Sequence, residues 1–124
     1  EMDKLDEARD GFKWAVRYKP NHTGALCGLA EVYARKKMLG LAVDLYREAI
    51  KSCKPAKAGP IYVQLARLFK EKDQWEAAAQ AYNKAIELGE SDDMIVFELG
   101  VAYFRCNNRQ AARIQIGNIG QCIG

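Results

Sequence analysis

The side chains of this sequence that are best suited to catalysis or metal binding are four cysteines and one histidine. A structural zinc site needs four closely grouped ligands, and here no two cysteines form a Cys-x-x-Cys pair. A catalytic thiol needs a base held beside it, and nothing in the sequence orients His22 toward Cys27. Glycine-rich phosphate loops and nucleophile elbows are also missing. We therefore expect no metal, no cofactor and no enzymatic activity.

Cys27 is the thiol with the clearest reason to be reactive. We expect it one turn into a helix, where the helix dipole lowers a thiol pKa. Cys53 is expected at the same end of that helical hairpin, so a disulfide between Cys27 and Cys53 is an alternative. The side chain of Cys27 should point away from Cys53, which disfavours this bridge. The pattern favours reduced thiols in a reducing compartment, and hence a cytoplasmic protein.

Composition limits the remaining classes of function. The chain has 124 residues, 49% of them hydrophobic, and only 3 prolines, which is typical of one folded, largely helical domain. A net charge of +3 is too small to predict a nucleic-acid surface, and RNA binding rests only on the pI near 8.7. No apolar run approaches the roughly 18 residues of a membrane span. Because the chain begins at Glu1 without an initiator methionine, we expect a piece of a longer protein.

Small residues recur along the chain with a nearly constant period. Ala30, Ala66 and Gly100 form one ladder, with sequence spacings of 36 and 34. A second ladder has spacings of 34, 36 and 34 and consists of Ala8, Ala42, Ala78 and Ala112. Both ladders gain their two extra residues in the stretch KSCKPAKAGP. A period near 34 predicts stacked structural repeats, each too small to bury its own apolar face.

Apolar residues around each ladder position follow helical spacing. Leu26, Leu29, Ala30 and Tyr33 recur at i, i+3, i+4 and i+7, and the pattern repeats in each later unit. Small residues at the crossings let two helix axes approach closely. The sequence predicts an all-α fold of about seven helices and no strands, with helices at 3–19, 23–37, 40–53, 59–71, 74–88, 92–105 and 108–123.

Turn and capping signals separate these helices. Pro60 suits a helix start, and Asp73 with Glu76 resembles a capping box. Ser91 is expected to cap the helix that follows it. Short turns are expected at Gly40 and at Asn107-Asn108.

The pattern resembles the tetratricopeptide repeat in the segments LCGLAEVY…AVDLYREA, YVQLARLF…AAAQAYNKA and VFELGVAY…AARIQIGNI. The resemblance covers essentially the whole chain, although Ile119 stands where alanine is usual. It implies an α-solenoid of stacked antiparallel hairpins in a single domain. The units would be the second helix of a truncated repeat at 1–20 and repeats at 21–54, 59–92 and 93–124.

The resemblance also implies a function, because first helices of such repeats line a groove that binds a peptide or helix of a partner protein. The implied groove residues are Cys27, Glu31, Arg35, Val63, Arg67, Lys70, Met94, Phe97, Val101, Phe104 and Arg105. A carboxylate-binding clamp known in the family is not expected, because acidic Glu31 and Glu98 occupy matching positions.

The large apolar side chains of the third groove stripe have two interpretations. Met94, Phe97, Val101 and Phe104 either contact a partner or are buried by a further repeat. The alternative function is a structural spacer or self-assembly unit that associates through its end helices.

Trp14 and Trp75 are expected to be packing residues. The glycines at 117, 120 and 124 either weaken a terminal helix or admit another helix closely.

Overall fold

The computed structural model describes the backbone of residues 2–114 and the side chains of residues 4–107, and within that part the chain is all-helical. In chain order the elements are α1 (Met2–Tyr18), α2 (Thr23–Arg35), α3 (Leu39–Ser52), the short 3-10 helix η1 (Pro55–Lys57), α4 (Gly59–Glu71), α5 (Trp75–Glu87) and α6 (Asp93–Ile114). The all-α solenoid expected from the sequence is confirmed, and the first five helices begin and end within two residues of their expected limits.

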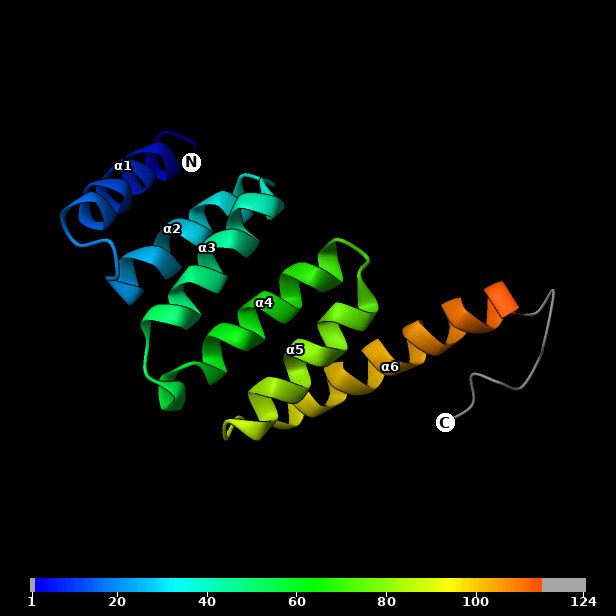
Figure 1. Ribbon diagram of the computed structural model, residues 1–124. Coiled ribbons are helices and arrows are strands. Elements are labelled where there is room, and N and C mark those ends of the chain that lie inside the picture. Colours follow the sequence, from blue (N-terminus) through cyan, green and yellow to red (C-terminus); the bar gives the residue numbers. More distant parts are fainter. Residues whose placement is uncertain (1, 115–124) are drawn as a thin grey trace.

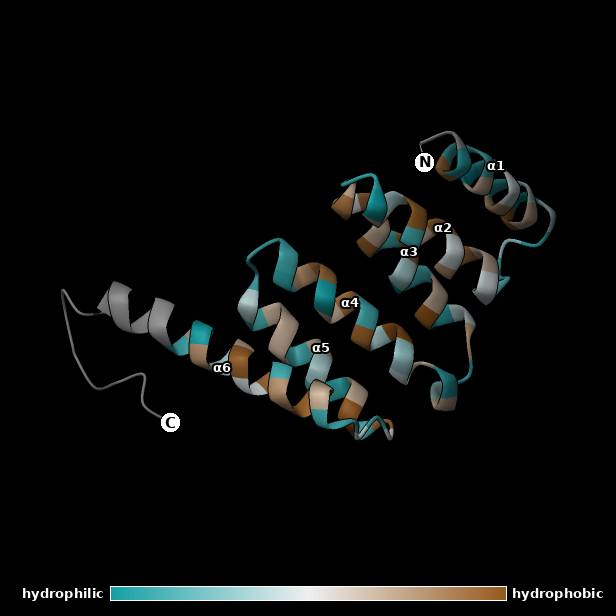
Figure 2. Cartoon of the chain, turned by 180° about the vertical axis from the view of Figure 1, so that it is seen from behind, coloured by the Kyte–Doolittle hydropathy of each residue, from teal (hydrophilic) through white to brown (hydrophobic). Residues whose placement is uncertain are grey.

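The helices stack in chain order as antiparallel neighbours (Figure 1). Helices α2 and α3 form one hairpin, and α4 and α5 form the next. Helix α1 packs on α2 at one end of the stack, and α6 packs on α5 at the other end. Apolar and polar residues alternate along each helix, as an amphipathic element in a stack requires (Figure 2).

In the two complete hairpins, the small residues of the ladders are buried between the paired helices. The positions with no exposed surface include Ala30, Ala42, Ala49, Ala66, Ala78 and Ala85. Tyr46 and Tyr82 fill the space beside them and are 4% and 0% exposed. The sequence therefore builds each hairpin crossing from side chains that let the two backbones approach, with an aromatic ring at the flank.

The two complete hairpins share one turn geometry. Lys37 has φ 65° and Asp73 has φ 64°, so both residues adopt the left-handed conformation, which is uncommon outside glycine. In each turn the residue after the left-handed one donates a backbone hydrogen bond to the carbonyl of an aromatic residue. In the first hairpin the Met38 N–H donates to the Tyr33 carbonyl over 2.8 Å. The turn expected at Gly40 is wrong by three residues, because Gly40 already lies inside α3.

Helix starts match the expected signals in part. Pro60 stands in the first turn of α4, as expected. Helix α5 has Gln74 at its N-cap, so the cap expected at Asp73 is displaced by one residue. The cap of α6 is Asp92 rather than Ser91, since the Asp92 Oδ1 accepts a hydrogen bond from the Met94 N–H over 3.0 Å.

The packing of α1 on α2 depends on a glycine. A Cβ atom built at Gly28 would lie 2.5 Å from ring carbons of Phe12, closer than real atoms approach. Phe12 and Val16 thus face α2 and the core, and Trp14, midway between them in the sequence, lies on the far side of the helix. The expectation that Trp14 is a packing residue is wrong, because it is 66% exposed. Trp75 does pack against the core.

The third repeat differs from its expected form. The turn predicted at Asn107-Asn108 is absent, and α6 continues unbroken from Asp93 to Ile114. The remainder of the predicted last helix, including Ile119 and the glycines at 117, 120 and 124, lies outside the described residues. Within the described residues no helix returns along α6, and Val96 is 52% exposed and Tyr103 is 45% exposed.

Candidate functional site

Two adjoining clefts run between α2 and α4, the first helices of the complete repeats. The larger cleft, of about 370 Å³, is lined by Glu31, Ala34, Arg35, Lys37, Tyr46, Gln64, Arg67, Leu68 and Glu71. The smaller, of about 250 Å³, is lined by Cys27, Gly28, Glu31, Tyr46, Pro60, Ile61 and Gln64. The structure thus brings together four residues of the expected groove, and it adds Tyr46 and Gln64, which the sequence did not single out as groove residues. The sequence assigned Tyr46 to the apolar core stripe. Its ring does belong to the core, and it also lines the cleft.

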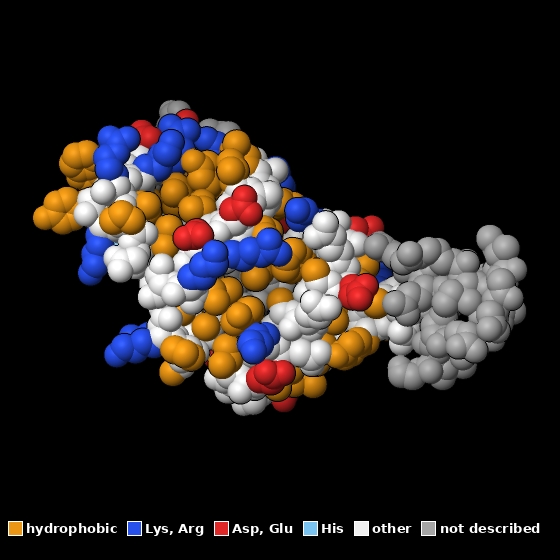
Figure 3. Space-filling view, in the orientation of Figure 1, with side chains coloured by type: hydrophobic (Ala, Val, Ile, Leu, Met, Phe, Trp, Pro, Cys, Tyr) orange, Lys and Arg blue, Asp and Glu red, His pale blue; other side chains and the backbone are white. Residues whose placement is uncertain are grey.

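Charges along this groove are paired within the chain. The Arg35 Nη2 lies 3.1 Å from the Glu31 Oε2, and the Lys37 Nζ lies 3.6 Å from the Glu71 Oε1. Figure 3 shows the resulting mixture on one face, with Lys and Arg side chains beside Asp and Glu side chains over apolar surface. Such exposed pairs contribute little to stability and leave the groove without a dominant charge.

A half-buried carboxylate connects α4, α5 and α6. Glu98 accepts hydrogen bonds from the Lys70 Nζ over 2.8 Å and from the Tyr82 hydroxyl over 3.0 Å. Arg67 lies 3.6 Å from its other oxygen. Two expected groove cations, Arg67 and Lys70, therefore neutralise an acidic residue of the neighbouring repeat.

The pKa values of this cluster follow from these contacts. Burial by itself raises the pKa of Glu98, but the hydrogen bonds from Lys70 and Tyr82 and the charges of Lys70 and Arg67 outweigh it, so the pKa lies below its ordinary value. Burial, and then the hydrogen bond to Glu98, raise the pKa of the Tyr82 hydroxyl. Glu98 is therefore a charged structural group at neutral pH.

The expected groove stripe on α6 is largely exposed. Met94 is 57% exposed, Phe97 is 67% exposed and Phe104 is 64% exposed, while Val101 is partly buried. The guanidinium of Arg105 lies 5.2 Å from the centre of the Trp75 ring, a cation–π distance. These side chains form an open apolar strip at the end of the stack.

Val63 was expected to line the groove, and the structure places it in the core instead. It is 5% exposed and belongs to the hydrophobic core, so it offers no surface to a partner. Its equivalent one repeat later is Phe97. Helix α4 lies inside the stack and α6 lies at its end, which explains why equivalent positions have opposite exposure (Figure 1).

Cys27 does not have the microenvironment of a reactive thiol. Burial, with a smaller contribution from Cys53, raises the pKa of Cys27, so the expected lowering by the helix dipole is wrong. Cys27 and Cys53 are free thiols. The imidazole of His22 has another role, since its Nδ1 accepts a hydrogen bond from the Ala25 N–H over 3.0 Å and caps α2.

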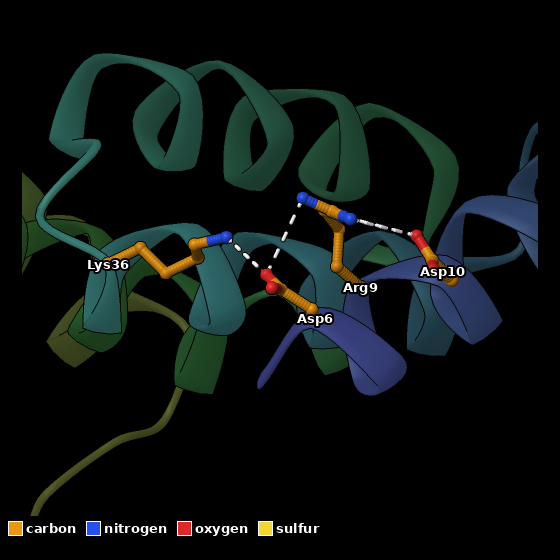
Figure 4. Close-up of polar contacts among 4 residues, drawn as sticks. All are labelled: Asp6, Arg9, Asp10 and Lys36. Carbon is orange, nitrogen blue, oxygen red and sulfur yellow. Dashed lines mark hydrogen bonds and ion pairs between the residues drawn. The ribbon is translucent and has the colours of Figure 1, made fainter. Parts of the chain in front are cut away.

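Helix α1 is attached to the first hairpin by an ionic contact that the sequence did not reveal (Figure 4). The Lys36 Nζ lies 2.6 Å from the Asp6 Oδ1, and Arg9 approaches the same oxygen at 3.6 Å. The hydrogen bond from Lys36, opposed by burial, lowers the pKa of Asp6. Asp6 and Lys36 are 30 residues apart, a separation at which no local pattern predicts contact.

The described residues include no group of three or more His, Cys, Asp or Glu side chains arranged to hold a metal ion. Among those same residues, none of the helices combines the length and the apolarity that a membrane crossing requires.

Solved structures share this fold. YrrB, a TPR protein with an unusual peptide-binding site, superposes with a TM-score of 0.72 and 22% identity over 87% of this chain and 53% of YrrB. MamA gives a TM-score of 0.73 and 19% identity over 94% of this chain and 70% of MamA. The N-terminal domain of stress-induced protein-1 from C. elegans gives 0.67 and 14% identity over 73% of this chain and 75% of that domain.

Sequence relatives are much longer proteins. The chain is 26% identical over 115 residues, 91% of its length, to the RNA polymerase-associated protein CTR9 of Caenorhabditis elegans. It is 31% identical over 94 residues, 75% of its length, to the protein O-mannosyl-transferase TMTC3 of Mus musculus. The chain spans about a tenth of the length of these curated relatives.

Family models account for most of the chain. A tetratricopeptide repeat model matches residues 1–58, and a second model, for the TPR repeat, matches residues 66–106. These matches agree with the repeat period of the sequence, the small-residue crossings and the antiparallel hairpins. The chain belongs to the tetratricopeptide-repeat family, whose members generally mediate protein–protein interactions.

Proposed function

We propose that this chain is a protein-binding scaffold or adaptor that holds a peptide or an amphipathic helix of a partner protein along α2, α4 and α6. The observation that carries the proposal is the apolar strip on α6, where Met94, Phe97 and Phe104 are each more than half exposed. Large apolar side chains clustered on one helix face are characteristic of interaction surfaces. YrrB, which shares this fold, has a peptide-binding site, and that is consistent with the same use here.

The chemistry of the surface specifies the partner further. The α6 strip presents large apolar side chains, and the cleft between α2 and α4 presents internally paired charges and the polar Gln64. A partner helix with an apolar face at one end and a polar, mixed-charge flank at the other complements both parts. In this proposal Arg67 and Lys70 position Glu98 and shape the groove, and Val63 supports it from the core.

The proposal includes no catalytic step and no cofactor, and it places the protein in the cytoplasm. The thiol of Cys27 has a raised pKa, and His22 is engaged as a helix cap, so neither is activated. We expect no nucleic-acid partner, because the cations of the groove are paired with carboxylates.

The test compares the wild-type chain with the double variant Phe97→Ser/Phe104→Ser. Binding is measured against a displayed library of amphipathic peptides, and bound sequences are then titrated by calorimetry. The matched control is Trp14→Ser/Tyr18→Ser, which removes two aromatic side chains that are 66% and 87% exposed on α1. We expect the α6 variant to keep its helicity and lose binding, and the α1 variant to keep both.

Two results would contradict this proposal. Equal loss of binding in both double variants would mean nonspecific hydrophobic attachment. Loss of the fold in Phe97→Ser/Phe104→Ser would assign these residues to the core of a longer stack, in which a further repeat covers them.

A second candidate function is self-assembly through the end helices. Trp14 and Tyr18 on the outer face of α1 support it, because they are exposed and face away from the stack. Sedimentation at several concentrations tests it. Self-assembly predicts a larger species that Trp14→Ser/Tyr18→Ser removes, and a monomer at all concentrations excludes it.

A further inference from the structure

The C-terminal half of α1 presents exposed aromatic rings beside cations. Trp14 and Tyr18 lie at i and i+4 on one face of the helix, and they are 66% and 87% exposed. Lys13 and Arg17 lie beside them with the same spacing, and Lys19 follows the helix; all three are exposed. We call these five residues the α1 patch. Figure 3 shows Lys and Arg side chains gathered beside apolar ones over α1.

The repeat register places the α1 patch on a face that stays open inside the stack. One repeat after Trp14 and Arg17 stand Glu48 and Lys51 of α3. The side chains of Glu48 and Lys51 are 60% and 75% exposed, although α3 has neighbours on two sides, α2 and α4. The exposure of the patch is therefore a property of this helix face, and it does not depend on the position of α1 at one end of the stack.

The same positions of α3 and α5 carry internally paired charges. The Lys51 Nζ lies 3.6 Å from the Glu48 Oε1, and the Lys84 Nζ lies 3.7 Å from the Glu87 Oε1. Such pairs are usual on a solvated helix face. In α1 the two equivalent positions hold an aromatic residue and a cation instead. The outer face of α1 therefore differs in chemistry from the outer faces of the later second helices.

The cations of the α1 patch have no acidic partner among the described residues. None of the ion pairs within residues 4–107 includes Lys13, Arg17 or Lys19. The carboxylate that precedes them, Asp10, lies 3.2 Å from the Arg9 guanidinium. The helix dipole favours a cation near a helix C-terminus, but it does not explain two aromatic rings left in water beside that cation. Tryptophan, tyrosine and arginine are the residue types most enriched among those that dominate binding at interfaces.

We propose that the α1 patch binds an acidic peptide segment that also carries apolar side chains and belongs to a partner protein. Carboxylates of the segment pair with Lys13, Arg17 and Lys19, and its apolar side chains pack on the two rings. The patch shares no residue with the groove of α2, α4 and α6, so the inference is independent of the proposed function. The chain therefore has separate surfaces for two partners.

The distribution of charge along α1 distinguishes this partner from other anionic ones. Glu7 and Asp10 stand seven and four residues before Trp14, on the same helix face, and both are exposed. A membrane surface or a nucleic acid is extended and would meet these carboxylates as well as the cations, whereas a short segment contacts the cations alone. A second copy docked through the same patch would bring like charges together.

The test compares two charge reversals at equivalent positions. The probe is a short, blocked, fluorescently labelled peptide of alternating glutamate and leucine, and its binding is followed by anisotropy at an ionic strength of about 0.15 M. We expect Arg17→Glu to weaken binding at least about tenfold, the loss typical of a central interface residue. The matched control Lys51→Glu, one repeat later, should leave binding unchanged. Circular dichroism checks that both variants keep their helices.

Two double variants locate the bound peptide. Trp14→Ser/Tyr18→Ser should lose binding as Arg17→Glu does, because the apolar side chains of the peptide lose the rings on which they pack. Phe97→Ser/Phe104→Ser should bind the peptide as the wild-type chain does. This second variant separates the α1 patch from the groove, so that failure of one proposal is distinguishable from failure of the other.

Four results would overturn the inference. The first is an absence of binding to the wild-type chain. The second is equal weakening by Arg17→Glu and Lys51→Glu, which would mean nonspecific attraction between charges. The third is loss of binding in Phe97→Ser/Phe104→Ser, which would assign the peptide to the groove. The fourth is tighter binding of phosphatidylserine vesicles or of a single-stranded oligonucleotide, which would assign the patch to a membrane or to a nucleic acid.

Discussion

Helices α4 and α6 are equivalent elements of successive repeats. Side chains that are buried in α4, the sealed helix, have equivalents that are exposed in α6, the open helix. Val63 is 5% exposed, and its equivalent Phe97 is 67% exposed. Ala66 is fully buried, and its equivalent Gly100 is exposed. The residue types are similar and the helical spacing is identical, so the difference arises from the neighbours. In a repeat protein, the burial of a residue is set by its place in the stack as much as by its own side chain.

The largest expected effect contrasts the sealed core with the open strip. Tyr82 is 0% exposed, and Tyr82→Ala should lower the free energy of unfolding by about 3–5 kcal/mol, the usual cost of removing a buried aromatic ring. Phe97→Ala should change it by less than about 0.5 kcal/mol, because that ring is already in solvent. Urea unfolding measures both values. Similar costs at the two sites would mean that Phe97 is covered in solution.

The second prediction uses one glycine at each end of the stack. Gly28→Ala should destabilise the chain by about 1–3 kcal/mol, because the added Cβ meets the Phe12 ring at 2.5 Å. Gly100→Ala should stabilise it by up to about 1 kcal/mol, since nothing lies within 4 Å and alanine favours the helix. Thermal unfolding of both variants provides the measurement. A stabilising Gly28→Ala would show that α1 packs on α2 less closely than described.

The third prediction concerns the carboxylate that joins the sealed and open repeats. The pKa of Glu98 is lowered in the folded chain from an ordinary value of 4.5. Its contribution to stability is therefore present above about pH 4.5 and is lost as the pH falls through the folded pKa. Glu98→Gln should flatten the acid limb of the stability curve, as followed by denaturant unfolding between pH 3 and 7, roughly the range in which carboxyl groups titrate. An unchanged acid limb would show that other carboxyl groups dominate.

The smallest expected effect concerns the exposed groove pairs. Arg35→Gln breaks the contact with Glu31 at 3.1 Å and should cost about 0.3 kcal/mol, a typical value for an exposed pair four residues apart. The loss should shrink further in high salt, where exposed charges are screened. Unfolding at low and high ionic strength provides the check. A loss above about 1 kcal/mol would show that the groove charges are structural in the way that those around Glu98 are.

Much of the fold followed from the sequence because it depends on local spacing. The ladders that contain Ala30 and Ala42 predicted which residues lie at the hairpin crossings, and the apolar period predicted the first five helices within two residues. One error concerns a turn that the period did predict, because α6 continues unbroken through Asn107-Asn108. Other errors concern features that the period does not encode. The sequence did not predict that Trp14 faces outward, or that the turn at Gly40 begins three residues earlier at Lys37.

The groove was predictable only as a set of helix faces. Helical geometry placed Glu31 and Arg67 on one cleft, but it also placed Val63 there, which the stack buries. The sequence assigned Tyr46 to the core and could not show that it also lines the cleft. Tyr46 is 4% exposed, and this burial, together with the charge of Glu31, raises the pKa of its hydroxyl to about 12.

The sequence by itself determined the repeat length, the helices and the residues at their crossings, because helix periodicity and side-chain size act over a few turns of one chain. The tertiary structure decided which equivalent positions are sealed and which are open, and it paired Glu98 with Lys70 and Asp6 with Lys36, residues that lie far apart along the chain. Those outcomes depend on the order in which helices stack, and a side chain's exposure and pKa are properties of what lies against it.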